Sequence, residues 1–224
     1  MKIIGLVASP HGIKGNTAGL LDIVIEGAKS EGAKAQIISL PGDTVLPCKA
    51  CDACHISGVC PQKDDFEEIK AKILDSDGLI LASPNYIFSV SAQMKAFMDR
   101  CCGIIHCMGF EGRYGASVVT SGGGDEGPIA DYLSHFLIIT GIIPVGAVWA
   151  NMGMIENGDF PKETHYMAFE LGKRLVTCWA KKNNSPEIEK SKDAFLKRMK
   201  SLIQYRKEEW PYEYQYWKEH RNLK

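Results

Sequence analysis

Continuous apolar runs alternate with amphipathic stretches along the first 182 residues of the chain. Runs without polar alternation are typical of strands buried on both faces of a parallel sheet. The expected strands cover residues 2–8, 35–40, 78–83, 116–121 and 143–150. Helical spacing predicts helices that begin at Asn16 or Thr17, at Asp64 or Asp65, at 91, at 128, and at Phe160 or Pro161. The last four end near 76, 102, 140 and 182.

This alternation predicts an α/β fold with a doubly wound five-stranded parallel sheet of order 2-1-3-4-5. We expect residues 1–184 to form this domain, with a cysteine-rich loop inserted at 40–65. The run from Asn183 to Pro186 then breaks the helical pattern. Residues 185–224 are amphipathic and end in a cluster of aromatic residues. This C-terminal extension is too small to fold alone, so we expect it to pack on its own domain or on a neighbouring subunit.

Charge and composition exclude several classes of partner. The chain has 224 residues, with 26 Lys plus Arg and 27 Asp plus Glu, for a formal charge of −1. That balance gives no electrostatic reason to expect nucleic acid or an anionic membrane as a partner. The short apolar run at 2–8 ends at Ser9-Pro10, which favours a buried strand over a signal peptide, and no stretch approaches the length of a membrane span. We expect a soluble cytoplasmic protein with reduced thiols.

Half of the eight cysteines lie in one segment without helical or alternating periodicity, which predicts a long irregular loop. Three of them are each separated by two residues, and the fourth precedes a proline, as in the bacterial ferredoxin run. The longer gap before the fourth cysteine contains Gly58 and gives the chain slack to gather all four sulfurs around one cubane. The pattern predicts one [4Fe-4S] site whose ligands are Cys48, Cys51, Cys54 and Cys60.

Other interpretations of these cysteines remain open. Four thiolates could bind structural zinc, although such sites usually come as two separated pairs. Disulfides would require an oxidising compartment. Reduced cysteines could also simply line a pocket, since free cysteine is a small buried hydrophobe. We expect His55 to be a solvated loop residue, and the remaining cysteines to be core residues: Cys101, Cys102, Cys107 and Cys178.

Three loops carry residues suited to a ligand, and the predicted strand order places them at one edge of the sheet. The loop after the first strand runs from Ser9 to Thr17 and leads into a helix N-terminus, where free amides and the helix dipole favour an anion. The loop after the third strand contains two aromatic residues that could stack on a planar ring. The loop after the fourth strand is glycine-rich, so a ligand could approach its backbone. Trp149 and Asn151, after the fifth strand, could reach a ligand, but a position at a core edge is favoured.

These loops also carry sequence marks of a known family. The marks are Ala8-Ser9-Pro10 with Gly15-Asn16-Thr17, Ser83-Pro84-Asn85-Tyr86 with Lys95 to Arg100, and Thr120-Ser121-Gly122-Gly123. Over roughly residues 1–180 the chain resembles the flavodoxin-like NAD(P)H-dependent FMN reductases. The compact cysteine run resembles that of the iron-sulfur flavoproteins within this family.

The resemblance implies a flavodoxin-like fold and an FMN site built by the three loops. By resemblance, the FMN phosphate would be held by Ser9, His11, Asn16 and Thr17. The isoalloxazine would be surrounded by Pro84, Asn85, Tyr86, Ile87, Phe88 and Ser89, and covered by Ser121, Gly122, Gly123 and Gly124. Family members often have an arginine where this chain has His11, so the helix N-terminus would hold the phosphate without a fixed cation.

The expected function is an oxidoreductase that uses FMN and a [4Fe-4S] cluster to interconvert two-electron and one-electron transfer. The sequence singles out no catalytic acid or base. The resemblance implies a ferredoxin-like or nicotinamide electron donor, with NAD(P)H possible, a small-molecule acceptor, and a homodimer or homotetramer in which one subunit's cluster approaches another's flavin. The alternative is an NAD(P)H-dependent FMN or quinone reductase without a cluster. A zinc-holding binding protein is a third possibility, which leaves the three convergent loops unexplained.

Overall fold

The computed structural model describes residues 1–155 and 159–223. Its sheet has five strands, every neighbouring pair parallel, in the order β2-β1-β3-β4-β5, which confirms the predicted topology. The strands are β1 (Lys2–Val7), β2 (Lys34–Ser39), β3 (Gly78–Pro84), β4 (Tyr114–Ser121) and β5 (Ile143–Asn151). Strands β3 and β4 are buried along their whole length, as expected for central strands of a parallel sheet that is covered on both faces.

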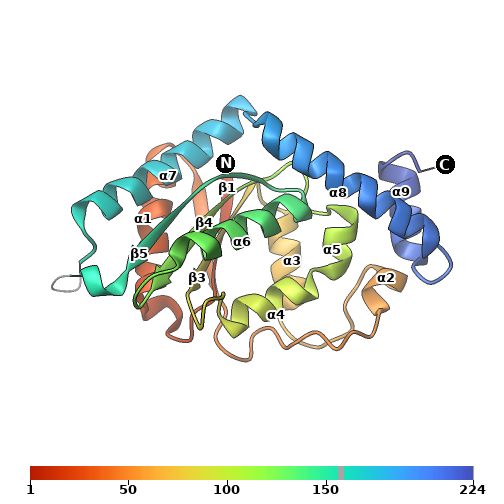
Figure 1. The fold of residues 1–224 in the computed structure, drawn as a ribbon, viewed down its shortest axis with the longest axis horizontal. Coiled ribbons are helices and arrows are strands. Elements are labelled where there is room, and N and C mark those ends of the chain that lie inside the picture. Colours follow the sequence, from red (N-terminus) through yellow and green to blue (C-terminus); the bar gives the residue numbers. More distant parts are fainter. Residues whose placement is uncertain (156–158, 224) are drawn as a thin grey trace.

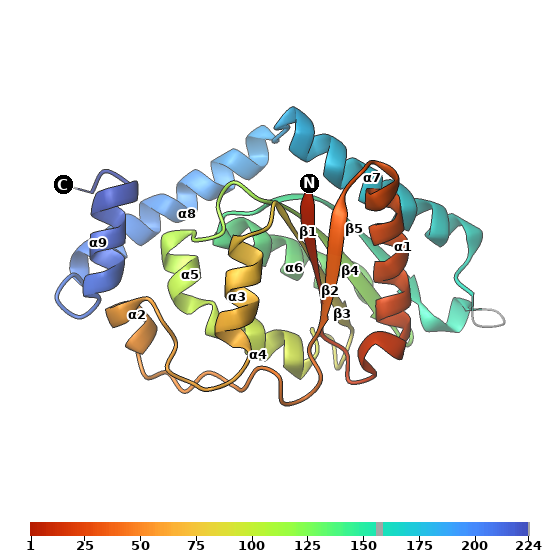
Figure 2. The ribbon, with the colours of Figure 1, turned by 180° about the vertical axis from the view of Figure 1, so that it is seen from behind.

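Helices cover both faces of this sheet (Figures 1 and 2). On one face, α1 (Asn16–Ser30) and α7 (Lys162–Lys181) pack on a core that includes Ile3, Ile80 and Val118. On the other face, α3 (Phe66–Leu74), α4 (Ala92–Arg100) and α6 (Glu126–Thr140) surround a second core. The strands that carry the three ligand-type loops are therefore packed against a separate apolar core on each face of the sheet.

Two glycines let α1 and α7 approach each other closely. A Cβ on Gly27 of α1 would stand 1.9 Å from the Phe169 carbonyl oxygen, and a Cβ on Gly172 of α7 would stand 1.9 Å from the Val24 carbonyl oxygen. Both atoms belong to backbone, so no side-chain rotation would relieve the clash. Glycine at these two positions is therefore required for the close packing of α1 against α7.

The helix expected over 91–102 is interrupted. Helix α4 ends at Arg100, and a second short helix, α5 (Cys102–Cys107), begins after Cys101, whose φ of −81° and ψ of 11° fall outside the helical range. The buried Cys101 belongs to the apolar core shared by α3, α4 and α6, whereas Cys102 is the first residue of α5. The apolar pattern continues through the bend, so it did not indicate this break.

The cysteine loop is not irregular throughout. It contains a short helix, α2 (Ala53–Ser57), which ends at Gly58 with a φ of +77°. A side chain at Gly58 would also meet the ring of Tyr212 at 2.4 Å. Glycine is therefore required here both for its left-handed conformation and for the close contact with the C-terminal segment.

The C-terminal extension forms α8 (Pro186–Tyr205) and α9 (Pro211–His220). Helix α8 leads away from the end of α7 and along α6, and α9 lies beside α2 and α5 (Figures 1 and 2). A third apolar cluster, with Phe195, Met199, Ile203 and Trp217, joins the extension to Met108. Within the described parts of the chain, no helix has the length and apolar character needed to cross a membrane.

Candidate functional site

The three loops predicted to meet do line one cavity, of about 200 Å³, at the carboxyl ends of β1, β3 and β4. Nine of its lining residues were predicted from the sequence: Ser9, His11, Asn16, Thr17, Pro84, Asn85, Tyr86, Ser121 and Gly122. Thr120 and Met152 also line it and were not predicted. The other predicted residues, Ile87, Phe88, Ser89, Gly123 and Gly124, belong to the same loops but are not part of this lining.

The loop after β1 presents free backbone donors to the cavity. It contains a 3-10 turn, η1 (Gly12–Lys14), and α1 begins after Gly15. The expected N-cap was Asn16 or Thr17, but Gly15 holds that position with no side-chain cap, because Asn16 and Thr17 already lie in the first turn. The amides of these two residues have no acceptor among residues 1–155 and 159–223, as is usual in a first helical turn. The Asn16 Nδ2 contacts Met152 Sδ at 2.9 Å.

The loop after β3 is a tight hairpin. Asn85 pairs with Val90, and the backbone amides and carbonyls of Tyr86 and Ser89 bond to each other at 2.9 and 3.2 Å. The two tip residues, Ile87 and Phe88, have φ values of 51° and 60° and are 91% and 78% exposed. Left-handed backbone is uncommon for any residue other than glycine and is strained for a β-branched one. Two large apolar side chains are therefore held in the open beside the cavity.

The loop after β4 closes the opposite side. No described atom lies within 4 Å of the place that a Cβ would take on Gly122, Gly123 or Gly124, so the backbone there is open to a ligand. Asn85 Nδ2 donates to the Gly124 carbonyl at 3.0 Å and ties this loop to the β3 hairpin. The buried Asn85 Oδ1 finds no partner in the described part of the chain.

The four loop cysteines are free thiols. Cys48 and Cys51 are exposed, and Cys54 and Cys60 are half-buried. Ala50 N donates to Cys48 Sγ at 3.4 Å, and the backbone of Ala50 is left-handed, with a φ of 49°. Among the described residues, no three of these sulfurs lie within 4.8 Å of one another. Around one zinc ion they would stand about 3.8 Å apart, given Zn–S bonds of about 2.3 Å.

A buried ion pair anchors both ends of this loop. Arg100 Nη1 donates to the Leu46 carbonyl at 3.0 Å and to Asp64 Oδ2 at 2.6 Å, while Asp64 also accepts from Leu46 N at 2.9 Å. Both charged side chains are almost fully buried. Burial alone would raise the pKa of Asp64, but the hydrogen bonds from Arg100, Leu46 and Phe66 and the guanidinium charge outweigh it and lower that pKa. Arg100, one of the residues that carry the family resemblance, thus holds the cysteine loop in place through Leu46 and Asp64.

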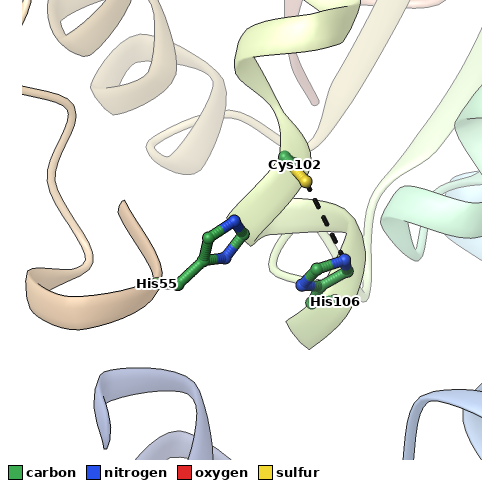
Figure 3. Close-up of side chains that lie close together, drawn as sticks. All are labelled: His55, Cys102 and His106. Atoms are coloured by element: carbon green, nitrogen blue, oxygen red, sulfur yellow. Dashed lines mark hydrogen bonds between the residues drawn. The ribbon is translucent and has the colours of Figure 1, made fainter. Parts of the chain in front are cut away.

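His55 was expected to be solvated, but it is 5% exposed. It lies beside His106 and Cys102 of α5 (Figure 3). The indole of Trp210 stacks on its ring. The fully buried Glu213 of α9 bonds to Nδ1 of both histidines, with a distance of 2.9 Å to His106. Helix α9 therefore removes His55 from water. Sequence reasoning missed this cluster because its members come from a loop, a helix bend and the far end of the chain.

The cluster changes the acidity of its members. Burial would lower the pKa of His106, but hydrogen bonds to Cys102 and Glu213 raise it to about 9. Hydrogen bonds from His106 and His55 lower the pKa of the Cys102 thiol to about 6. The expectation that all four remaining cysteines are core residues is therefore wrong for Cys102, which is half-buried and polarised. It holds for Cys101 and Cys107, which are buried, and Cys178 packs at the edge of the α1 and α7 core.

The residues at the carboxyl end of β5 and just after it play a smaller part. Trp149 is 46% exposed and lies outside the cavity lining. Asn151 Oδ1 accepts from Gly153 N at 2.8 Å and caps a 3-10 turn, η2 (Met152–Met154). That turn places Met152 in the cavity lining.

Comparison with known proteins agrees with this geometry. The family model described as NADPH-dependent FMN reductase matches residues 1–156. An "Iron-sulfur flavoprotein" of Archaeoglobus fulgidus is 30% identical over 98% of this chain and 98% of its own length. Another, of Methanocaldococcus jannaschii, is 33% identical over 80% of this chain and 86% of its own length.

A solved structure shares the fold. The structure described as "the flavodoxin, WrbA-like protein from Agrobacterium tumefaciens" superposes with a TM-score of 0.58, at 17% identity, over 81% of this chain and 99% of that one. The family match, the sheet order and the three-loop cavity make the protein a flavin-dependent oxidoreductase. The chain belongs to the NADPH-dependent FMN reductase family and, within it, groups with the iron-sulfur flavoproteins.

Proposed function

We propose that the protein binds FMN in the three-loop cavity, together with a [4Fe-4S] cluster on the cysteine loop, and interconverts two-electron and one-electron transfer. FMN exchanges electrons in pairs or singly, and a cubane cluster exchanges them singly. The observation that carries the flavin half is the convergence of all three loops on one cavity at the carboxyl ends of β1, β3 and β4.

Each loop would have a separate task in flavin binding. The free amides of Asn16 and Thr17, with the hydroxyl of Ser9, would hold the phosphate at the N-terminus of α1, and His11 would lie beside it. Tyr86 of the cavity lining, with Ile87 and Phe88 from the hairpin tip beside it, would contact the isoalloxazine, while the open glycine backbone after Ser121 would cover it. These residues would orient the ring and exclude water from one of its faces.

The cysteine loop suits a cubane better than a single metal ion. Its four thiols are free, and among the described residues no three of their sulfurs come within 4.8 Å of one another, whereas one zinc ion would need them about 3.8 Å apart. The Ala50 N–H points at the Cys48 sulfur, and hydrogen bonds to cysteine sulfur tune cluster potentials. The related chains are named iron-sulfur flavoproteins. A ferredoxin-like or nicotinamide donor, a small-molecule acceptor and a homodimer or homotetramer complete this proposal.

Anaerobic purification with quantified FMN, iron and sulfide tests it. We expect about four irons per chain, as a cubane requires, and one FMN, with a broad absorbance that dithionite bleaches. The Cys51→Ser variant should lose the iron and keep FMN, whereas Cys178→Ser, which alters a half-buried cysteine on α7, should keep both. Full iron content in Cys51→Ser would contradict the ligand assignment.

A second function is supported by the family match alone: an NAD(P)H-dependent FMN or quinone reductase without a cluster. The exposure of Cys48 and Cys51 is compatible with it, since exposed thiols need no metal. Anaerobically prepared protein with FMN, nicotinamide oxidation and no stoichiometric iron would establish this function instead.

A further inference from the structure

Three side chains that bind transition metals converge at a place separate from the flavin cavity. The nearest donor atoms of His55, Cys102 and His106 all lie within 4.8 Å of one another. Cys102 Sγ is 3.8 Å from His106 Nε2. Ligand atoms of one tetrahedral zinc ion stand about 3.3 to 3.6 Å apart for this donor set, given Zn–N and Zn–S bonds of about 2.0 and 2.3 Å. Small side-chain movements would bring all three onto one ion.

The backbone explains why these atoms meet. Cys102 and His106 are four residues apart on α5, so their side chains share one helix face. His55 comes from α2, and its ring stacks on that of His106 with centroids 5.0 Å apart. Figure 3 shows the two imidazoles facing each other beside the Cys102 sulfur. Trp210 covers both rings, at 4.6 and 4.9 Å between centroids, and limits their rotation.

Glu213 orients the two rings as metal ligands require. Its carboxylate is fully buried and accepts from Nδ1 of each histidine, one oxygen for each ring. When Nδ1 is held in this way, Nε2 of each ring is the atom available to a metal. A carboxylate behind a metal-bound imidazole is a recurrent arrangement that fixes the ring and raises its basicity. Burying a carboxylate is costly. A carboxylate that is buried and shared by two histidines therefore favours a role in orienting metal ligands over a role in packing.

We propose that His55, Cys102 and His106 bind one divalent transition-metal ion, zinc by preference, in addition to the cluster on the cysteine loop. Two imidazoles and one thiolate are a donor set of intermediate softness, which suits zinc. Three protein ligands leave a fourth position for water. Cys102 would bind as the thiolate, and its proton would pass to solvent.

The ion would join three segments that are distant in sequence. It would bond α2 directly to α5, and through Glu213 it would hold α9 against both. These segments already pack closely: a Cβ on Gly103 would stand 3.3 Å from Glu213 Oε1 and 3.6 Å from the Cys54 carbonyl oxygen. His55 directly follows Cys54, so the ion would also fix the middle of the cysteine run. Its binding would stabilise the folded chain by mass action.

Metal analysis of the intact, anaerobically purified chain tests the proposal. After incubation with zinc and removal of loosely bound metal, we expect about one zinc per chain in the wild type, as a single site of this kind requires. His106→Ala and Cys102→Ser should each lose it. The matched controls His165→Ala and Cys178→Ser, both on α7, should keep it. Flavin content and circular dichroism would show that each variant is folded.

Cys51→Ser separates this site from the loop. It should lose cluster iron but retain zinc, so failure of the cluster proposal would leave the zinc result unchanged. Glu213→Gln keeps the three ligands but weakens the hold on the rings, and should lower zinc affinity about ten- to hundredfold. Zinc retained in both His106→Ala and Cys102→Ser, or lost in Cys51→Ser, would overturn the assignment.

X-ray absorption at the zinc edge gives a result that needs no variant. The wild type should show one sulfur at about 2.3 Å and two imidazole nitrogens at about 2.0 to 2.1 Å. A shell of four sulfurs would place the metal on the loop cysteines and overturn the proposal. Failure of the wild type to retain zinc or cobalt beyond its cluster iron would do the same.

Discussion

The hydroxyl oxygens of Thr17 and Thr120 lie 2.6 Å apart, although the residues are separated by 103 positions in the sequence. This bond joins the first turn of α1 to the carboxyl end of β4, and both residues line the three-loop cavity. Both side chains are almost fully buried. The phosphate end and the ring end of the proposed flavin site are therefore coupled through one pair of hydroxyl groups.

Thr17→Val removes one of these hydroxyls and preserves the shape of the side chain. It leaves Thr120 without its partner and takes a donor from the proposed phosphate site. A hydrogen bond to a charged group contributes about 1.5–3 kcal/mol, so the dissociation constant of FMN should rise roughly ten- to hundredfold. Titration of flavin-free protein by fluorescence quenching measures this. Thr164→Val, on the half-exposed start of α7, is the control. Equal affinities in the two variants would argue against a contribution of the Thr17 hydroxyl, in addition to its amide, to phosphate binding.

The hairpin tip at Ile87 and Phe88 gives opposite expectations for stability and for flavin binding. Each left-handed residue other than glycine costs about 1–2 kcal/mol, and Asn-Gly is the preferred pair for such a turn. The double substitution Ile87→Asn with Phe88→Gly relieves this strain but adds the chain entropy of a glycine, so it should stabilise the flavin-free chain by about 1–2 kcal/mol while weakening FMN binding. Urea unfolding and FMN titration on the same preparations give both values. A gain in stability with unchanged affinity would show that these side chains do not contact the flavin.

The sheet and the three-loop cavity were predictable from the sequence because both follow from local patterns. Buried parallel strands require long apolar runs, and parallel strands bring their carboxyl ends, with the loops that follow, to one edge. Residues such as Asn16 and Asn85 could therefore be placed together without knowledge of any contact between them. Met152 was missed because its position depends on a turn after β5.

The histidine cluster could not be predicted in the same way. Glu213 is 158 residues from His55 and 107 from His106 along the chain, and no periodicity links these three positions. His55 lies in a segment whose pattern predicted a loop, and loop histidines are usually solvated. The one local signal was the four-residue spacing of Cys102 and His106, which places both side chains on one face of a helix. The bend at Cys101 separates this helix, α5, from α4.

Contact between α1 and α7 at Gly172 should be highly sensitive to a single methyl group. Gly172→Ala places a Cβ 1.9 Å from the Val24 carbonyl oxygen, so the helices must separate along their contact. Overpacking of a core typically costs about 1–3 kcal/mol, and the backbone clash puts this variant at the upper end. Gly127→Ala in α6, where no described atom lies within 4 Å of the new Cβ, is the control, and helix propensity should make it neutral or slightly stabilising. Similar unfolding midpoints for the two variants would contradict the close contact.

The buried pair of Arg100 and Asp64 makes stability depend on pH. Asp64→Asn leaves the guanidinium without its counter-charge and should destabilise the chain by about 3–5 kcal/mol, as for other broken buried pairs. The folded chain lowers the pKa of Asp64, so the wild type's advantage is complete above the unfolded pKa of about 3.9. It decreases as the pH falls toward the lower, folded pKa.

Urea unfolding of both proteins between about pH 3 and pH 6, around that unfolded value, tests this dependence. The difference in unfolding free energy should be constant at the upper end and should narrow toward the lower end. Asp99→Asn breaks an exposed pair with Lys95 and should change stability little. A difference between wild type and Asp64→Asn that grows as the pH falls would contradict the lowered pKa. Because the pair anchors both ends of the cysteine loop, Asp64→Asn should also lose cluster iron faster on exposure to air, while its FMN content stays unchanged.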